Sequence, residues 1–162
     1  MLVKSFQAVL LVTLLCSCGF QLRGMDISEL ESVSISGPVG GELRRALEQS
    51  LKDNGLKIVA AGSDVVDIRL IDVRTSRRPI STSARIDAAQ YELRLELDVS
   101  LTLDSQAIAS GISLSADRIY SVDSLNLSGS YEEQQNLMSE ISYEVADMTI
   151  HRLEVWLDGR RD

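Results

Sequence analysis

Four arginines between residues 74 and 89 are the side chains best suited to hold a charged ligand. This stretch contains one acidic residue, Asp87, although the whole chain has 24 acidic and 16 basic side chains. Arginine can hold a phosphate through two parallel hydrogen bonds, so a polar segment of this composition could bind phosphorylated head groups. The alternative is that these arginines are solvated charges on an exposed connection. Both interpretations apply to Arg74, Arg77, Arg78 and Arg85.

Residues for catalysis or metal binding are sparse. His151 is the only histidine, and a single histidine in a helical segment is more often a surface residue than a general base. No serine lies in a Gly-x-Ser-x-Gly elbow, and the glycines of residues 37–41 lack the Gly-Lys-Ser/Thr ending of a phosphate loop. We therefore predict no enzyme activity, no metal and no cofactor. A hydrolase that uses a serine and His151 is the weakest alternative.

Cys18 is the residue with a predicted covalent modification. Lys4 and the apolar run from Phe6 to Leu15 match a secretory signal, and the run is shorter than the roughly 20 residues that span a bilayer. Leu15, Ser17 and Cys18 then match the lipobox of bacterial lipoproteins. That pattern predicts cleavage after Ser17 and attachment of diacylglycerol to the Cys18 thiol. The alternative is an ordinary cleaved signal in which Cys18 has no special role.

Length and charge predict one acidic domain. Removing the first 17 of 162 residues leaves 145, a common size for a single domain. The loss of Lys4 leaves 15 basic against 24 acidic side chains, a net charge of about −9. An acidic surface argues against nucleic-acid binding, which uses lysine and arginine to neutralise phosphates. Both cysteines lie in the export region, so no disulfide framework is expected.

Periodicity predicts a strand, a helix and a second strand region before residue 74. Residues 32–36 alternate polar and β-branched side chains. Residues 42–54 place their apolar side chains on one helical stripe, which Gly55 ends. Residues 56–59 could be a short strand or the end of the helix loop. The alternation over 66–73 changes parity at Leu70-Ile71, which indicates either a β-bulge or a strand with both faces partly covered, and we favour the bulge.

The strictest pattern is the alternation from Tyr91 to Leu103, which predicts a long strand with one dry and one wet face. Residues 104–106 form a turn and 108–116 the return strand of a long hairpin. The polar residues 74–89 and 121–129 are predicted loops. Ser130 to Glu133 has the sequence of a capping box, which predicts a long helix from there to about Trp156.

These elements predict an α+β two-layer sandwich with β-α-β-β-β-α order. Two amphipathic helices would cover one face of a mostly antiparallel sheet of about four strands, while the other face stays polar. The predicted domain spans residues 32–158. It follows a cleaved signal over 1–17 and a lipidated lead-in over 18–31, and it ends in a short tail over 159–162.

The predicted mature start, Cys18-Gly19-Phe20-Gln21-Leu22-Arg23-Gly24, resembles the LptE family of lipopolysaccharide-assembly lipoproteins. Members of that family typically begin Cys-Gly-Phe/Tyr/Trp-x-Leu-Arg-Gly. The order of the later segments is also similar: a helix ending in Asn-Gly-Leu, a basic loop, an Ala-x-Tyr start of the long strand, and a long last helix. The resemblance therefore covers nearly the whole mature chain.

The resemblance implies a protein held by its lipid at the periplasmic face of the outer membrane. There it would plug and help assemble the β-barrel protein LptD, bind lipopolysaccharide and assist its transport to the outer leaflet. Gly19 suits sorting to the outer membrane.

In the LptE family, lipopolysaccharide binding is linked to basic residues in loops, which implies Arg77, Arg78 and Arg85 as candidates here. A second basic position, before the last helix, is missing from residues 121–130. The alternative function is a free-standing periplasmic lipoprotein that binds a small anionic or lipid ligand through the arginine-rich segment.

Overall fold

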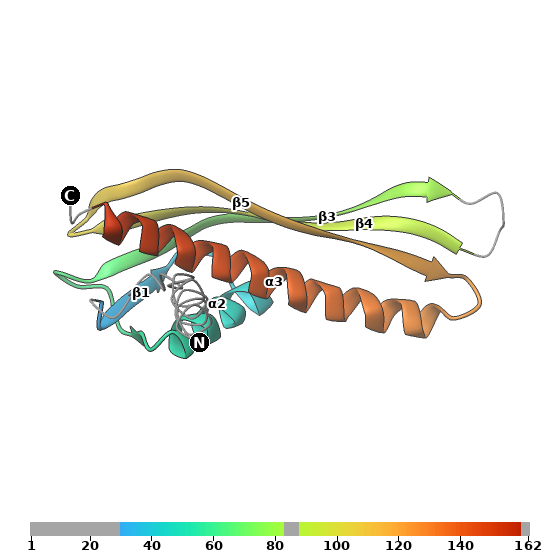
Figure 1. Ribbon diagram of the computed structural model, residues 1–162, viewed down its shortest axis with the longest axis horizontal. Helices are drawn as coiled ribbons and strands as arrows, with labels where there is room; N and C mark the ends of the chain where they lie inside the picture. The colour runs from blue at the N-terminus through green and yellow to red at the C-terminus, as the bar shows by residue number, and fades with distance from the viewer. Residues whose placement is uncertain (1–29, 83–87, 160–162) are drawn as a thin grey trace, which may run out of the picture.

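The computed structural model describes residues 30–82 and 88–159. Its elements are β1 (Ser32–Ser36), α2 (Gly41–Asp53), β2 (Lys57–Ile58), β3 (Val66–Thr82), β4 (Ala88–Leu103), β5 (Gln106–Asp123) and α3 (Leu127–Asp158). Three long strands, β3 to β5, run the length of an elongated molecule, and α3 lies along them (Figure 1). We call the end with the β4–β5 turn the proximal end, and the end with the β5–α3 connection the distal end.

The sheet has five strands in the order β2-β1-β3-β4-β5. Strand β1 is parallel to β2 and β3, whereas β3, β4 and β5 are antiparallel to one another. Helix α2 connects β1 to β2, and both helices pack on one face of the sheet (Figure 1). The predicted α+β class with two helices on one face is therefore confirmed. The sheet has one strand more than expected, because residues 57–58 pair with β1.

The dry face predicted for the long strand is the inner face of the sheet, which packs against the helices. Its five central side chains are at most 3 % exposed, whereas Tyr91 and Leu103 at its two ends are partly buried. The five are Leu93, Leu95, Leu97, Val99 and Leu101. From the helices, the predicted stripes supply buried residues such as Leu47 in α2 and Ile141 and Leu153 in α3. Each such side chain stabilises the fold by about 1.5–3 kcal/mol when buried, so this layer is the main source of stability.

The predicted bulge in β3 is confirmed at Ile71. Leu70 pairs with Val99 and Asp72 pairs with Asp98, so Ile71 is the extra residue and its side chain is exposed. Before the bulge the even-numbered side chains face the core. From Val73 to Pro79 the odd-numbered side chains do, and a second register shift follows between Pro79 and Ser81.

The prediction of a loop over residues 74–89 was wrong for most of its length. Strand β3 continues to Thr82, and β4 begins at Ala88. Strand β1 pairs with β3 only as far as Arg69, so the rest of β3 is an edge strand. An edge strand tolerates Pro79, which lies next to a second register shift, between Pro79 and Ser81. Pairing with β4 therefore outweighs the polar composition of this segment.

The predicted capping box was also wrong. Helix α3 begins at Leu127, and Asn126 is its N-cap, with Oδ1 accepting a hydrogen bond from the Gly129 amide at 3.1 Å. Ser130 is buried in the first turn, where its hydroxyl accepts from the Asp123 amide at 3.0 Å and donates to the Asn126 carbonyl at 3.1 Å. The predicted loop over 121–129 is correspondingly shorter, because β5 extends to Asp123.

Candidate functional site

Arg77 and Arg78 are adjacent in β3, and they lie on opposite faces of the sheet. Arg77 pairs in register with Leu93, a buried residue of the inner face. Arg78 pairs with Glu92 on the outer face. The two arginines therefore do not form one basic cluster, although the sequence places them side by side.

Arg77 lies against two tyrosines on the inner face. Its Cζ atom is 3.7 Å from the centroid of the Tyr91 ring and 5.8 Å from that of Tyr120. The Arg77 Nε donates a hydrogen bond of 2.7 Å to the Tyr120 hydroxyl, which in turn donates to Gln134 Oε1 of α3 at 2.7 Å. The two rings are 6.1 Å apart. This arrangement joins β3, β4, β5 and α3, and it holds the guanidinium flat over Tyr91.

The terminal nitrogens of Arg77 are available to a ligand. Within residues 30–82 and 88–159, no carboxylate forms an ion pair with Arg77, and the residue is exposed. A stacked guanidinium keeps its charge, and its donor edge has the geometry for phosphate oxygens. The group can therefore bind an anion, and its stacked orientation reduces the entropy lost on binding.

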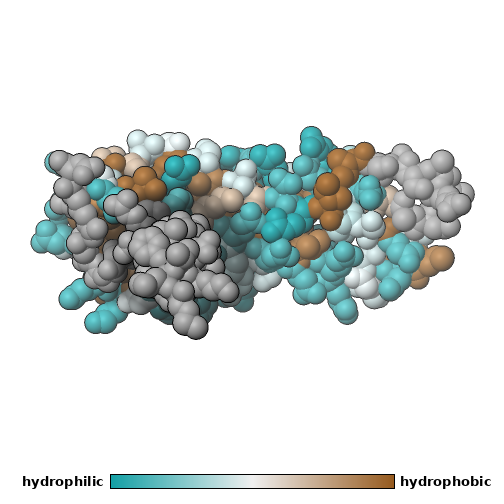
Figure 2. Space-filling view, viewed as in Figure 1, coloured by the Kyte–Doolittle hydropathy of each residue, from teal (hydrophilic) through white to brown (hydrophobic). Residues whose placement is uncertain are grey.

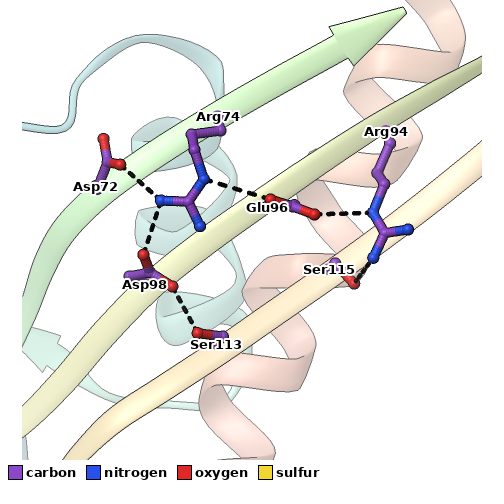
Figure 3. Close-up of polar contacts among 7 residues, drawn as sticks. All are labelled: Asp72, Arg74, Arg94, Glu96, Asp98, Ser113 and Ser115. Atoms are coloured by element: carbon purple, nitrogen blue, oxygen red, sulfur yellow. Dashed lines mark hydrogen bonds and ion pairs between the residues drawn. The ribbon is translucent and has the colours of Figure 1, made fainter. Parts of the chain in front are cut away.

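The other described arginines of this segment are already paired on the outer face. Arg78 forms an ion pair with Glu92, and such exposed pairs typically contribute about 0–1 kcal/mol. Arg74 lies in a network that crosses β3, β4 and β5 (Figure 3). Its guanidinium contacts Asp72 at 2.7 Å, Asp98 at 2.8 Å and Glu96 at 3.3 Å.

This outer-face network changes two proton affinities. The hydrogen bond from Arg74, helped by one from Ser113, lowers the pKa of Asp98 below its usual value. The same bond, with those to Asp72 and Glu96, raises the pKa of Arg74 further. Three carboxylates surround Arg74, so Arg74 is poorly placed to hold an additional anion.

Arg118 is a second arginine of the inner face that the sequence analysis missed. It pairs in register with Leu93, and its guanidinium contacts Glu140 at 2.8 Å and Glu144 at 2.7 Å in α3. Hydrogen bonds to these two carboxylates raise the pKa of Arg118. The alternation of the return strand could have identified it. The even-numbered residues of β5 share one face, and that face continues from Leu114 and Ala116 to Arg118 and Tyr120.

The remaining predicted site residues do not extend this site. Cys18, Ser17 and Arg85 lie outside the described residues. His151 is exposed on α3, with Nδ1 3.1 Å from Glu154 Oε2.

Among the described residues, no group of three or more His, Cys, Asp or Glu side chains could hold a metal ion. The same part of the chain has no helix that is long and apolar enough to cross a membrane.

Comparison with solved structures shows the fold. The crystal structure of rare lipoprotein B from Shewanella oneidensis is 24% identical and covers 81% of this chain and 99% of its own, with a TM-score of 0.70. The solution structure of an uncharacterized lipoprotein B from Nitrosomonas europaea is 22% identical, covers 86% and 93%, and has a TM-score of 0.69. A minor lipoprotein from Acinetobacter baumannii is 16% identical, covers 77% and 91%, and has a TM-score of 0.65.

A search of curated protein sequences found no match. The family model described as "LptE: Lipopolysaccharide-assembly" matches residues 23–153. This range begins inside the motif at the predicted mature start and ends near the C-terminus of α3, so it includes every strand of the sheet. The chain therefore belongs to the LptE lipopolysaccharide-assembly family.

Proposed function

We propose that this chain is a lipid-anchored outer-membrane protein that plugs and helps assemble the β-barrel protein LptD. In this role it binds lipopolysaccharide and aids its passage to the outer leaflet, by binding and assembly without catalytic turnover. The observation that carries the proposal is the family match over residues 23–153. Lipid attachment at Cys18 after cleavage behind Ser17 rests on the lipobox pattern in the sequence.

The proposed lipopolysaccharide contact is Arg77. Lipopolysaccharide carries phosphate groups, and the exposed guanidinium over Tyr91 offers donors that no described carboxylate occupies. A bidentate arginine–phosphate pair is stronger than a neutral hydrogen bond. Arg78 and Arg85 are the other candidates. Arg78 would have to exchange its ion pair with Glu92 for the phosphate.

The outer face of β3 to β5 supports the proposed place inside a barrel. The lumen of a large outer-membrane barrel is polar. The central part of this face carries Asp72, Arg74, Glu96, Asp98 and Ser113, which hydrogen bonds and ion pairs link into one polar network. A polar face of this kind suits contact with a polar wall.

Depletion of the protein tests the proposed function. We expect cells depleted of this chain to lose lipopolysaccharide from the surface and to accumulate misfolded barrel protein, and a plasmid copy of the full chain to restore both. If surface lipopolysaccharide and barrel folding stay normal, the proposal is wrong. Binding of small phosphates as tight as that of lipopolysaccharide would then favour the free-standing periplasmic lipoprotein.

A further inference from the structure

Exposed apolar side chains gather at the distal end of the molecule. Nine large hydrophobic residues of the described chain are exposed, and five of them lie at this end. We define the distal apolar tip as Ile80, Ile119, Leu125, Leu127 and Tyr131. Brown side chains are also visible toward this end of the molecule in the face shown in Figure 2. Such a concentration of exposed apolar residues marks a binding surface more often than chance exposure.

Hydrogen bonds hold the loop of the tip in one conformation. The Leu125 amide donates to the Asp123 carboxylate at 2.8 Å, and the Asn126 amide donates to the Asp123 carbonyl at 3.1 Å. Asn126 then caps α3 through the Gly129 amide. Leu125 is 85% exposed and Leu127 is 64% exposed. Both leucines are thus held on the surface by ordered structure, at a cost that an apolar ligand would offset.

An anion-binding group lies close to this tip. The Arg77 guanidinium is hydrogen-bonded to Tyr120, and Tyr120 is three residues before Asp123, where the tip loop begins. Three residues of a strand span roughly 10 Å. The distal end therefore combines a cation that can hold a phosphate with exposed apolar side chains.

We propose that the distal apolar tip binds the acyl chains of lipopolysaccharide while Arg77 holds a phosphate of the same molecule. This inference rests on the proposed function, and it assigns the apolar part of the ligand to Leu125 and Leu127. The occupant is an acylated, phosphorylated lipid rather than an apolar protein surface, because Arg77 brings to the same end of an acidic chain a positive charge that no carboxylate of residues 30–82 and 88–159 pairs with.

Photo-crosslinking in living cells identifies the occupant. The full chain is produced with Leu125, Leu127, Arg77 or Val59 replaced, one at a time, by p-benzoyl-phenylalanine, and irradiated. Val59 is the control, because it is exposed at the opposite end of the fold. We expect adducts that react with antibody to lipopolysaccharide at Leu125, Leu127 and Arg77, and none at Val59. Adducts only with protein at both leucines, alongside lipopolysaccharide adducts at Arg77, would overturn the inference and leave the proposed function standing.

A binding measurement separates the acyl chains from the phosphate. The full-length double variant Leu125→Ser/Leu127→Ser is compared with Val59→Ser for binding of lipopolysaccharide and of the same lipopolysaccharide stripped of its acyl chains. We expect the double variant to weaken binding of the acylated form about tenfold or more and to leave binding of the stripped form unchanged. An equal affinity of both variants for the acylated form would contradict the inference. Failure of the wild-type chain to bind either form would contradict the proposed function itself.

Discussion

At the scale of single residues, the bulge at Ile71 decides which arginine reaches the inner face. Strand β3 buries Ile68 and Leu70 before the bulge, so an uninterrupted alternation would turn the even-numbered residues inward. The extra residue reverses this parity and brings Arg77 over Tyr91. It also leaves Arg74 and Arg78 on the outer face, where carboxylates of β4 neutralise them. One inserted residue thus places Arg77, which can bind a ligand, on the opposite face from Arg74 and Arg78, which form ion pairs on the surface.

The substitution Arg77→Gln is expected to weaken lipopolysaccharide binding by about tenfold. The variant loses one charge-assisted contact of roughly 1.5 kcal/mol and keeps a polar side chain near Tyr120. The matched control is Arg78→Gln, one residue away on the opposite face, which should change binding less than twofold. Titration of the full-length variants with lipopolysaccharide measures both. Equal losses in the two variants would show that general positive charge, rather than the stacked guanidinium, is responsible.

Asp98 is expected to make stability depend on pH. The folded protein lowers the pKa of Asp98 below its ordinary value of 3.8, first through Arg74 and then through Ser113. The contribution to stability is therefore complete above pH 3.8 and is lost as pH falls through the lower folded value. Urea unfolding of the wild type and of Asp98→Asn should differ at pH 7, and the difference should shrink at pH 3. A difference that is the same at both pH values would contradict this assignment.

At the scale of elements, the start of α3 depends on Asn126. Replacing the N-cap with Asn126→Ala removes the acceptor of the Gly129 amide and should cost about 1 kcal/mol of unfolding free energy. Ser124→Ala is the control, because Ser124 is an exposed loop residue and should change stability by less than about 0.5 kcal/mol. Denaturant unfolding measures both values. If Ser124→Ala costs as much as Asn126→Ala, the cap is not the stabilising contact.

The close approach of the chain after β1 to the β3 backbone depends on Gly37. This glycine has a φ of +103°, and a Cβ atom there would lie 1.9 Å from the Leu70 carbonyl oxygen. Gly37→Ala should therefore destabilise the fold by more than about 2 kcal/mol. In Gly62→Ala, the nearest atom to the new Cβ is 4.0 Å away, so stability should change by less than about 1 kcal/mol. Thermal unfolding of the two variants checks this, and a mild effect of Gly37→Ala would argue against the close approach.

Residue patterns predicted the elements whose side chains face one packed layer. The alternation from Tyr91 to Leu103 and the apolar stripe of α2 were both found, because burial against a single layer imposes a strict period. The extension of β3 through Arg74, Pro79 and Thr82 was not predicted. Its composition favours a loop, and only pairing with β4 makes it a strand. Asn126 was missed because a nearby Ser-x-x-Glu sequence offered a competing cap.

The candidate site was only partly visible in the sequence. Arg77 was singled out by charge, but Tyr91, Tyr120 and Gln134 come from three other elements, and the fold brings them together. Arg118 was missed because the predicted return strand ended at residue 116. Long-range register decides these contacts, and local composition carries no information about it.

At the scale of the whole molecule, the two ends of the fold differ in thickness. The short strands β1 and β2, with α2, thicken the proximal half, whereas the described part of the distal half consists of β3, β4, β5 and α3 (Figure 1). Arg77 and the distal apolar tip both belong to the thin half. Under the proposed function, the thick end would be the part held by the barrel, and the thin end the part that contacts lipopolysaccharide.

Recovery of partners from the outer membrane tests the central claim most directly. The full-length lipoprotein, carrying a C-terminal affinity tag, is extracted in mild detergent and purified, and the associated proteins and lipopolysaccharide are quantified. The proposed role as a barrel plug predicts a large β-barrel protein in a one-to-one ratio with the chain, together with lipopolysaccharide. Purification of the chain without any large barrel protein would contradict it.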